Sequence, residues 1–144
     1  MRAADIGTTR VVQLNESSSA EEAACTMRHH DVGCVVVTKN TVLGALPSGI
    51  VTDRDLALRF HSRQNDQEKS SLHDIESLPL ATCRPDTTID ELVDIMQGSH
   101  VRRVPIVDEE GMLIGIVTLD DVIGALAELL HRVSGAANAA KAID

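Results

Sequence analysis

Aromatic residues are almost missing from this sequence: its 144 residues include no Trp, no Tyr and a single Phe, Phe60. Base-stacking platforms need several aromatic side chains, so single-stranded nucleic acid is not an expected ligand. Positive charge is also scarce, with 13 Lys and Arg against 22 Asp and Glu and a formal net charge of −9. That balance argues against binding nucleic acid or an anionic membrane through the overall field. The core has to be aliphatic.

Anchoring and export signals are missing as well. No apolar run approaches the roughly 18–20 residues that span a bilayer, and the first residues, Met1–Asp5, contain no apolar signal region. Cys25, Cys34 and Cys83 are an odd number of cysteines without a C-x-x-C spacing. This pattern favours free thiols in a reducing cytosol over disulfides or a zinc site. We expect a soluble, cytoplasmic protein that does not associate with membranes.

Catalytic and metal-binding motifs are not found either. The sequence contains neither G-x-G-x-x-G nor the P-loop lysine signature, and residues 46–49 lack the G-x-S-x-G frame of a hydrolase. His29 and His30 are adjacent, but neighbouring helical side chains diverge by about 100° and share one metal ion poorly. We therefore predict no catalytic residues, no metal site and no enzymatic activity.

What the sequence does contain is an internal duplication. Asp5-Ile6 recurs as Asp74-Ile75, and the same shift of 69 residues relates Glu22 to Glu91. Gly49–Thr52 recurs as Gly115–Thr118 with a shift of 66 residues. The three-residue difference falls within residues 38–49, where a Pro/Gly-containing loop is expected and insertions are tolerated.

Each copy predicts the same series of elements, β-α-β-β-α. The first helix of each copy begins with an S/T-x-x-E capping signal, Ser19 with Glu22 and Thr88 with Glu91. The expected strands are residues 10–14, 32–38 and 50–51 in the first copy and 80–83, 101–107 and 113–117 in the second. Residues 39–48 are expected to form a long connection, whereas Asp108–Gly111 predicts a tight hairpin turn. The second helix of each copy is expected to begin at about Asp53 and Leu119.

These elements predict an α/β (α+β) protein with two repeats, residues 1–61 and 72–132. Residues 62–71 are polar and charged and predict a linker. The Ala-rich tail, residues 133–144, either extends the last helix or frays. One repeat has too small an interior to be stable alone, so we expect the two to pack through their sheets with pseudo-two-fold symmetry.

The repeated heptapeptides Gly49–Asp55 and Gly115–Asp121 closely resemble the end of the CBS domain, a family named after cystathionine β-synthase. His100–Val107 is similar to the family's strand with an Arg-x-Pro-Val core. The resemblance covers residues 4–131 and implies a tandem CBS pair, also called a Bateman module. Such modules bind adenosine-containing ligands (AMP, ADP, ATP, NAD or S-adenosylmethionine) and pair into disc-shaped homodimers. AMP is the regulatory ligand expected here, with no required cofactor.

The Thr52-x-x-Asp55 and Thr118-x-x-Asp121 motifs have two possible roles. One is a helix N-cap whose acidic third residue also complements the helix dipole. The other is a ligand site, in which the carboxylate accepts both hydroxyls of a ribose diol and the helix N-terminus faces a phosphate. The two roles are compatible, because capping does not use both carboxylate oxygens.

The resemblance also implies that each cleft is assembled across the repeats. The first would combine Thr52, Arg54 and Asp55 with Val101, Arg102 and Arg103, and the second Thr118, Asp120 and Asp121 with Thr8, Val32 and Gly33. Only the first contains a cluster of guanidinium groups, which suit phosphate. We therefore expect a phosphorylated adenosine to prefer the Thr52 cleft. Alternatively, Arg102 and Arg103 are exposed strand-end residues or form a salt bridge at a dimer contact.

Two functions are compatible with these sequence features. The first is a stand-alone regulatory module that senses adenine nucleotides and signals through its homodimer to an unknown effector protein. The second is a dimerisation scaffold whose clefts are vestigial. Thermal stabilisation by adenosine compounds distinguishes the first function from the second.

Overall fold

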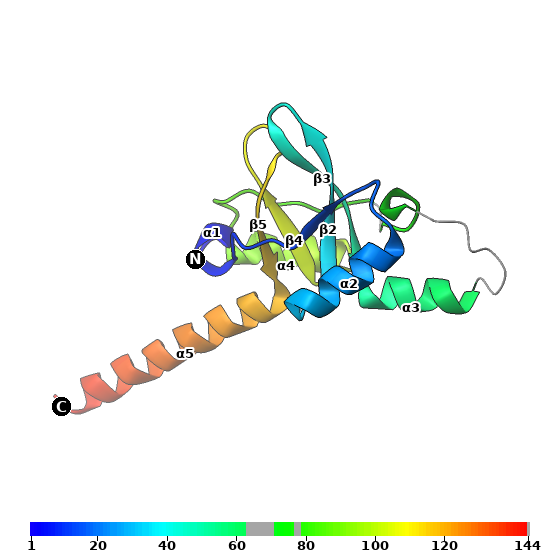
Figure 1. Ribbon diagram of the computed structural model, residues 1–144. Coiled ribbons are helices and arrows are strands. Elements are labelled where there is room, and N and C mark those ends of the chain that lie inside the picture. The colour runs from blue at the N-terminus through cyan, green and yellow to red at the C-terminus, as the bar shows by residue number, and fades with distance from the viewer. Residues whose placement is uncertain (63–70, 77–78, 144) are drawn as a thin grey trace.

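The computed structural model describes residues 1–62, 71–76 and 79–143 (Figure 1). The elements are α1 (Ala3–Ile6), β1 (Gln13–Asn15), α2 (Ala20–His30), β2 (Cys34–Thr41), β3 (Gly44–Thr52), α3 (Asp53–Ser62), the 3₁₀-helix η1 (Leu72–Asp74), α4 (Ile89–Gly98), β4 (Arg103–Val107), β5 (Leu113–Thr118) and α5 (Leu119–Lys141). They form two small sheets with helices, one sheet per repeat, as the duplication predicts. Most of the predicted linker, residues 63–70, lies outside the described residues.

The two sheets differ because of a single proline. In the first repeat β1 pairs parallel with β2, and β2 pairs antiparallel with β3. In the second repeat β4 and β5 pair, and residues 80–83 contribute only one bridge, Cys83 to Ile106. The prediction of a strand at 80–83 was therefore wrong. The Val36 N–H donates to the Val12 carbonyl, but Pro105, at the corresponding position, has no N–H and shortens the ladder.

The connection predicted at residues 39–48 is also wrong, because these residues continue the β2–β3 hairpin. Lys39 pairs with Leu46, and Thr41 pairs with Gly44 at the end of the hairpin. Gly44 adopts a φ of 136°, which closes a short turn that other residues would strain. Pro47 lies on β3, an edge strand, next to a register shift, where its missing donor disturbs the sheet little.

The predicted helix caps are confirmed. Ser19 and Glu22 form a reciprocal capping box at α2, in which the Ser19 Oγ accepts the Glu22 N–H at 3.1 Å and a Glu22 carboxylate oxygen accepts the Ser19 N–H at 3.3 Å. Thr88 and Glu91 form the same box at α4. Each box satisfies donors that the first turn leaves without partners.

The leading segment of each repeat packs into the core of the other repeat. Ala3 of α1 is fully buried in the second repeat's cluster, and Leu72 of η1 is fully buried in the first repeat's cluster. Two isolated bridges, Arg2 with Thr88 and Ser71 with Ser19, are related by the same shift of 69 residues found in the sequence. The repeats are therefore interlocked by a pseudo-symmetric exchange. A third cluster, with Val36, Ile50 and Ile116 at its centre, fills the space between them.

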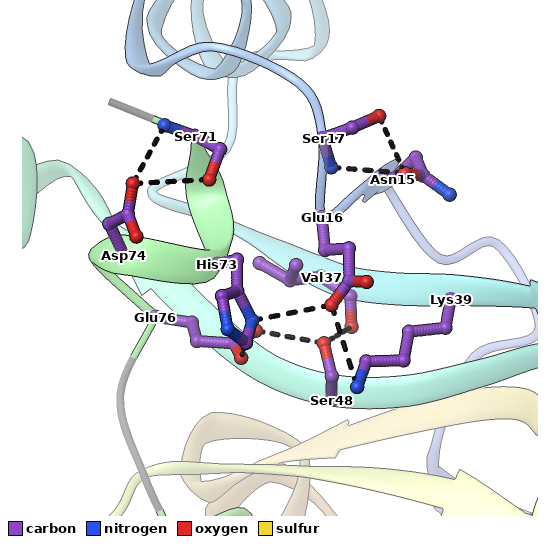
Figure 2. Close-up of polar contacts among 10 residues, drawn as sticks. All are labelled: Asn15, Glu16, Ser17, Val37, Lys39, Ser48, Ser71, His73, Asp74 and Glu76. Carbon is purple, nitrogen blue, oxygen red and sulfur yellow. Dashed lines mark hydrogen bonds and ion pairs between the residues drawn. The ribbon is translucent and has the colours of Figure 1, made fainter. Parts of the chain in front are cut away.

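Polar contacts fasten η1 to the first repeat (Figure 2). The His73 Nδ1 lies 3.3 Å from Glu16 Oε2 and 3.6 Å from Glu76 Oε1, and Ser48 Oγ donates to Glu76 Oε2 at 2.8 Å. The side chain of Glu76 is almost completely buried. A Cβ at Gly49 would lie 2.7 Å from the Glu76 Cβ, so this close approach requires glycine at position 49.

The Ala-rich tail extends the last helix rather than fraying: α5 runs to Lys141. Figure 1 shows its C-terminal part leading away from the rest of the molecule. Among the described residues, no helix is long and apolar enough to cross a membrane.

Candidate functional site

A hollow of about 250 Å³ lies between the repeats at the C-terminal end of β5. Of the six residues that the resemblance assigned to one cleft, it brings together four, Thr8, Val32, Gly33 and Thr118, whereas Asp120 and Asp121 do not line it. The rest of its lining consists of Arg10, Val11, Val12, Cys34, Arg103 and Ile116. Both repeats contribute, so the hollow exists only because the two are packed together.

Backbone pairing holds the two walls of this hollow together. The Thr8 N–H donates to the Ile116 carbonyl at 2.9 Å, and the Ile116 N–H donates to the Thr8 carbonyl at 2.9 Å. A Cβ at Gly115 would lie 3.0 Å from the Thr8 carbonyl oxygen. The glycine of the repeated G-h-V-T motif therefore allows the segment before β1 to cross β5 at this distance.

At the start of α5, Thr118 lines the hollow and forms a helix cap with Asp121, which does not itself line the hollow. Asp121 Oδ2 accepts the Thr118 N–H and the Thr118 hydroxyl, each at 2.7 Å, and Thr118 Oγ1 accepts the Asp121 N–H at 3.2 Å. No described residue donates a hydrogen bond to Asp121 Oδ1. One carboxylate oxygen therefore caps the helix, and the other is available to a ligand hydroxyl.

Arg103 supplies the cation of this hollow. It pairs with Thr118 across β4 and β5. A Cβ added to Gly33 would lie 3.6 Å from the Arg103 Nη2, so the guanidinium lies next to Gly33 of the first repeat. The side chain is half-buried, and among the described residues its guanidinium has no ion-pair or hydrogen-bond partner. A half-buried guanidinium without a partner is suited to bind an anion.

The resemblance to CBS domains implied Arg102 and Arg103 at the Thr52 cleft, whereas the structure places both beside Thr118. They line a depression of about 110 Å³ together with Thr118, Leu119 and Asp120. Arg102 Nη2 lies 3.6 Å from Asp120 Oδ1 in an exposed ion pair, which contributes little to stability. Arg103 lies beside Thr118 because the register of β4 and β5 pairs these two residues within the second repeat.

Around Thr52 the structure repeats the cap but does not gather the residues expected with it. Asp55 Oδ2 accepts the Thr52 N–H at 2.8 Å, and Thr52 Oγ1 accepts the Asp55 N–H at 3.1 Å. Arg54 is exposed. Val101 instead packs in the second repeat, where it lines an apolar hollow with α4 residues and Leu119. Residues 77–78, which correspond in sequence to Thr8–Thr9, lie outside the described residues.

Five residues that line the hollow were not expected from the sequence. They are Arg10, Val11, Val12, Cys34 and Ile116. Val11, Val12 and Ile116 form the apolar walls. In the sequence, Val11 and Val12 form an apolar pair just before β1, and Ile116 is the hydrophobic residue of the G-h-V-T motif, so these two patterns could have indicated them. Aliphatic side chains therefore match the flat, apolar part of a small ligand, and the Arg103 guanidinium matches an anionic part.

Two cysteines near the core have perturbed acidity. Burial raises the pKa of the Cys34 thiol, the nearby Arg103 guanidinium opposes this, and Asp53 adds to it. Burial raises the pKa of Cys83 to about 11. Both thiols are protonated at neutral pH, so neither is an activated nucleophile. Within residues 1–62, 71–76 and 79–143, no group of His, Cys, Asp and Glu is arranged to hold a metal ion.

The comparison with known families gives a match over most of the chain: the CBS domain model matches residues 3–62 and 72–128. An uncharacterized protein of Methanopyrus kandleri, MK0525, is 35% identical over 126 residues, which are 85% of this chain and 63% of that protein. The chain therefore spans less than two thirds of that relative. The CBS domain-containing protein YhcV of Bacillus subtilis is 32% identical over 133 residues, with 92% of this chain and 89% of YhcV covered.

Among solved structures, CBSX2 in complex with AMP superposes with a TM-score of 0.74 at 23% identity, covering 89% of this chain and 97% of CBSX2. This likeness shows the fold. Other CBS structures of similar fold were solved with S-adenosyl-L-methionine and with ATP. Each of these three proteins therefore binds an adenosine compound.

Proposed function

This chain belongs to the CBS domain family, and from that premise we propose that it is a regulatory module that binds an adenosine nucleotide, AMP in the first instance, in the Thr118 cleft. One observation carries the proposal. Thr118 and Arg103, whose guanidinium has no partner among the described residues, line one aliphatic hollow between the repeats, and Thr118 is hydrogen-bonded to Asp121, which has one spare carboxylate oxygen. These groups match a ribose diol, a phosphate and an adenine ring.

Each part of AMP has a proposed contact. Asp121 Oδ1 accepts the two ribose hydroxyls, and Arg103 and the N-terminus of α5 bind the phosphate. Adenine lies between Val11, Val32 and Ile116, which line the hollow. Because these walls are aliphatic and offer no ring stacking, we expect micromolar rather than nanomolar affinity. The Thr8 and Gly33 backbone lies at the same hollow and can hydrogen-bond the adenine edge.

The Thr52 motif is the pseudo-symmetric counterpart of this site. We assign Thr52, Arg54 and Asp55 to a second and weaker nucleotide cleft, supported by a similar cap in which Asp55 and Thr52 each accept the other's backbone N–H. We assign Arg102 and Asp120 to the rim of the Thr118 cleft, because both line the depression that also contains Thr118 and Arg103. This assignment reverses the preference expected from the sequence, because Arg103 lines the Thr118 hollow.

We assign signalling to a homodimer of this chain that binds an effector protein through its two packed repeats. A ligand shifts such an assembly only by binding one of its states more tightly than the other. The Thr118 cleft is suited to this role because its walls come from both repeats. A nucleotide bound in this cleft therefore contacts both repeats and stabilises one arrangement of the two.

The first prediction tests the proposal directly. Saturating AMP is expected to raise the melting temperature by several degrees, since a ligand that binds only the folded state stabilises it. 2′-Deoxy-AMP differs by one hydroxyl and is expected to bind about tenfold more weakly in calorimetry, because Asp121 Oδ1 loses one of its two partners. The absence of any thermal shift with AMP, ATP, NAD and S-adenosylmethionine would instead indicate a scaffold with vestigial clefts.

Cys34 offers a second test, because its side chain lines the cleft. In a Cys25→Ser background, which removes the exposed thiol, saturating AMP is expected to slow alkylation of Cys34 at pH 8 by at least about fivefold. Cys83 serves as an internal control that stays unlabelled in the folded protein, since burial raises its pKa to about 11. Labelling is followed by mass spectrometry. Equal Cys34 rates with and without AMP would place the nucleotide elsewhere.

A further inference from the structure

Helix α5 continues beyond the globular body with an apolar face that no described residue covers. Its 23 residues span about 34 Å. Val122, in the first turn, is buried in the second repeat's core. Farther along, Leu126 and Leu129 are each 40% exposed, Leu130 is 70% exposed and Val133 is 58% exposed. Figure 1 shows the C-terminal part of α5 without a neighbour.

The apolar residues of α5 follow a heptad spacing. The intervals alternate between three and four residues through Leu119, Val122, Leu126, Leu129, Val133, Ala136 and Ala140. Such a 3–4 alternation over three heptads is typical of a helix that packs along another helix. Single helices gain most of their stability from packing an apolar face rather than from propensity. The first heptad is packed against the core, and the same stripe then continues into solvent.

The charges on α5 indicate which helix fits this stripe. Asp120, Asp121 and Glu128 lie in its N-terminal half, and Arg132 and Lys141 lie in its C-terminal half. Within the described part of the chain, Glu128, Arg132 and Lys141 have no ion-pair partner. A parallel copy would set like charges against each other, whereas an antiparallel copy sets the acidic half against the basic half. The surface is thus complementary to itself in one orientation.

We propose that α5 pairs antiparallel with α5 of a second copy of this chain through residues 123–140. The two-fold axis passes beside position 131, which sets Leu126 against the partner's Ala136 and Leu129 against the partner's Val133. Glu128 then lies near the partner's Arg132. Large side chains meet smaller ones along the stripe, as close packing of two helices requires. The inference rests on the homodimer part of the proposed function and is independent of nucleotide binding.

Oligomeric state in the full chain tests the helix pair. The wild type is expected to sediment as a dimer, and Leu129→Glu, which buries a charge in the proposed seam, is expected to weaken dimerisation at least ~100-fold. Ala127→Glu adds the same charge at an exposed position outside the stripe and is expected to remain dimeric. A far-UV circular dichroism spectrum like that of the wild type, with a cooperative thermal transition, shows that each variant is folded. A dimer that persists in Leu129→Glu overturns the helix pair alone, and a monomeric wild type overturns the homodimer as well.

Cysteine crosslinking tests the orientation. In the Cys25→Ser background, an equimolar mixture of Leu126→Cys and Ala136→Cys chains is expected to form a disulfide-linked dimer on mild oxidation. Either chain alone is expected not to, because antiparallel pairing separates like positions by about 15 Å. Crosslinking of each single variant with itself would instead establish a parallel pair, and absence of crosslinking in the mixture would contradict the proposed register.

Discussion

Replacing Asp121 with Asn is expected to weaken AMP binding by roughly 10- to 100-fold, as measured by calorimetry, with little loss of stability. The asparagine oxygen can still accept the Thr118 N–H and hydroxyl, as Asp121 Oδ2 does at 2.7 Å. The amide nitrogen then replaces Oδ1 and cannot accept a ribose hydroxyl. Loss of hydrogen bonds to a charged acceptor corresponds to ~1.5–3 kcal/mol. Asp121→Asn therefore separates the capping role from the binding role.

Asp55→Asn is the matched control, because Asp55 caps α3 in the same way that Asp121 caps α5. If the Thr118 cleft is the principal site, Asp55→Asn is expected to change the affinity of the tighter site by less than about threefold. A large loss of AMP affinity in Asp55→Asn with none in Asp121→Asn would show that the nucleotide binds in the Thr52 cleft. It would also show that Arg103 does not bind the phosphate in the hollow that it lines. Equal losses in both variants would indicate two coupled clefts.

Much of the fold could be predicted from local signals. The duplication, the capping boxes at Ser19 and Thr88 and the hairpin of β4 and β5 are each encoded within a few residues. The hairpin of β2 and β3 was missed because Gly44 and Pro47 indicate a loop in isolation. In the folded chain, Gly44 closes a turn and Pro47 lies on an edge strand, so only the sheet partners show that both residues fit a strand pair.

The residues of the site could be predicted from the sequence except where their position depends on strand register. The resemblance to CBS domains assigned Thr118, Thr8, Val32 and Gly33 to one cleft together with Asp120 and Asp121. The structure brings the first four into one hollow, and the two aspartates do not line it. Arg103 was assigned to the opposite cleft. Because a side chain changes face with each residue along a strand, the cleft it serves is decided by its pairing with Thr118. Sequence spacing alone does not contain that pairing.

Leu72→Ala is expected to destabilise the protein by roughly 2–5 kcal/mol and to lower its melting temperature by about 10 °C or more. Leu72 is fully buried, although it lies on a 3₁₀-helix of only three residues. The cavity opens in the core of the first repeat, where Leu72 packs in the cluster of Ala23, Met27 and Val51. Leu43→Ala, at the exposed hairpin turn, makes the same change at a side chain that is 66% exposed and is expected to cost less than about 0.5 kcal/mol.

Which repeat Leu72→Ala destabilises tests the exchange of leading segments, because Leu72 precedes the second repeat in sequence but packs in the core of the first. In Leu72→Ala, native-state hydrogen exchange is expected to accelerate first in β2 and β3 rather than in β4 and β5. Ile6→Ala is the mirror variant: Ile6 precedes the first repeat and packs against the second repeat's core, so β4 and β5 are expected to exchange first. If each variant instead loosened only the repeat that follows it in sequence, the leading segments would not be exchanged in solution. If both hold, each repeat is completed by the other's leading segment, and a ligand between the repeats acts on a single cooperative unit.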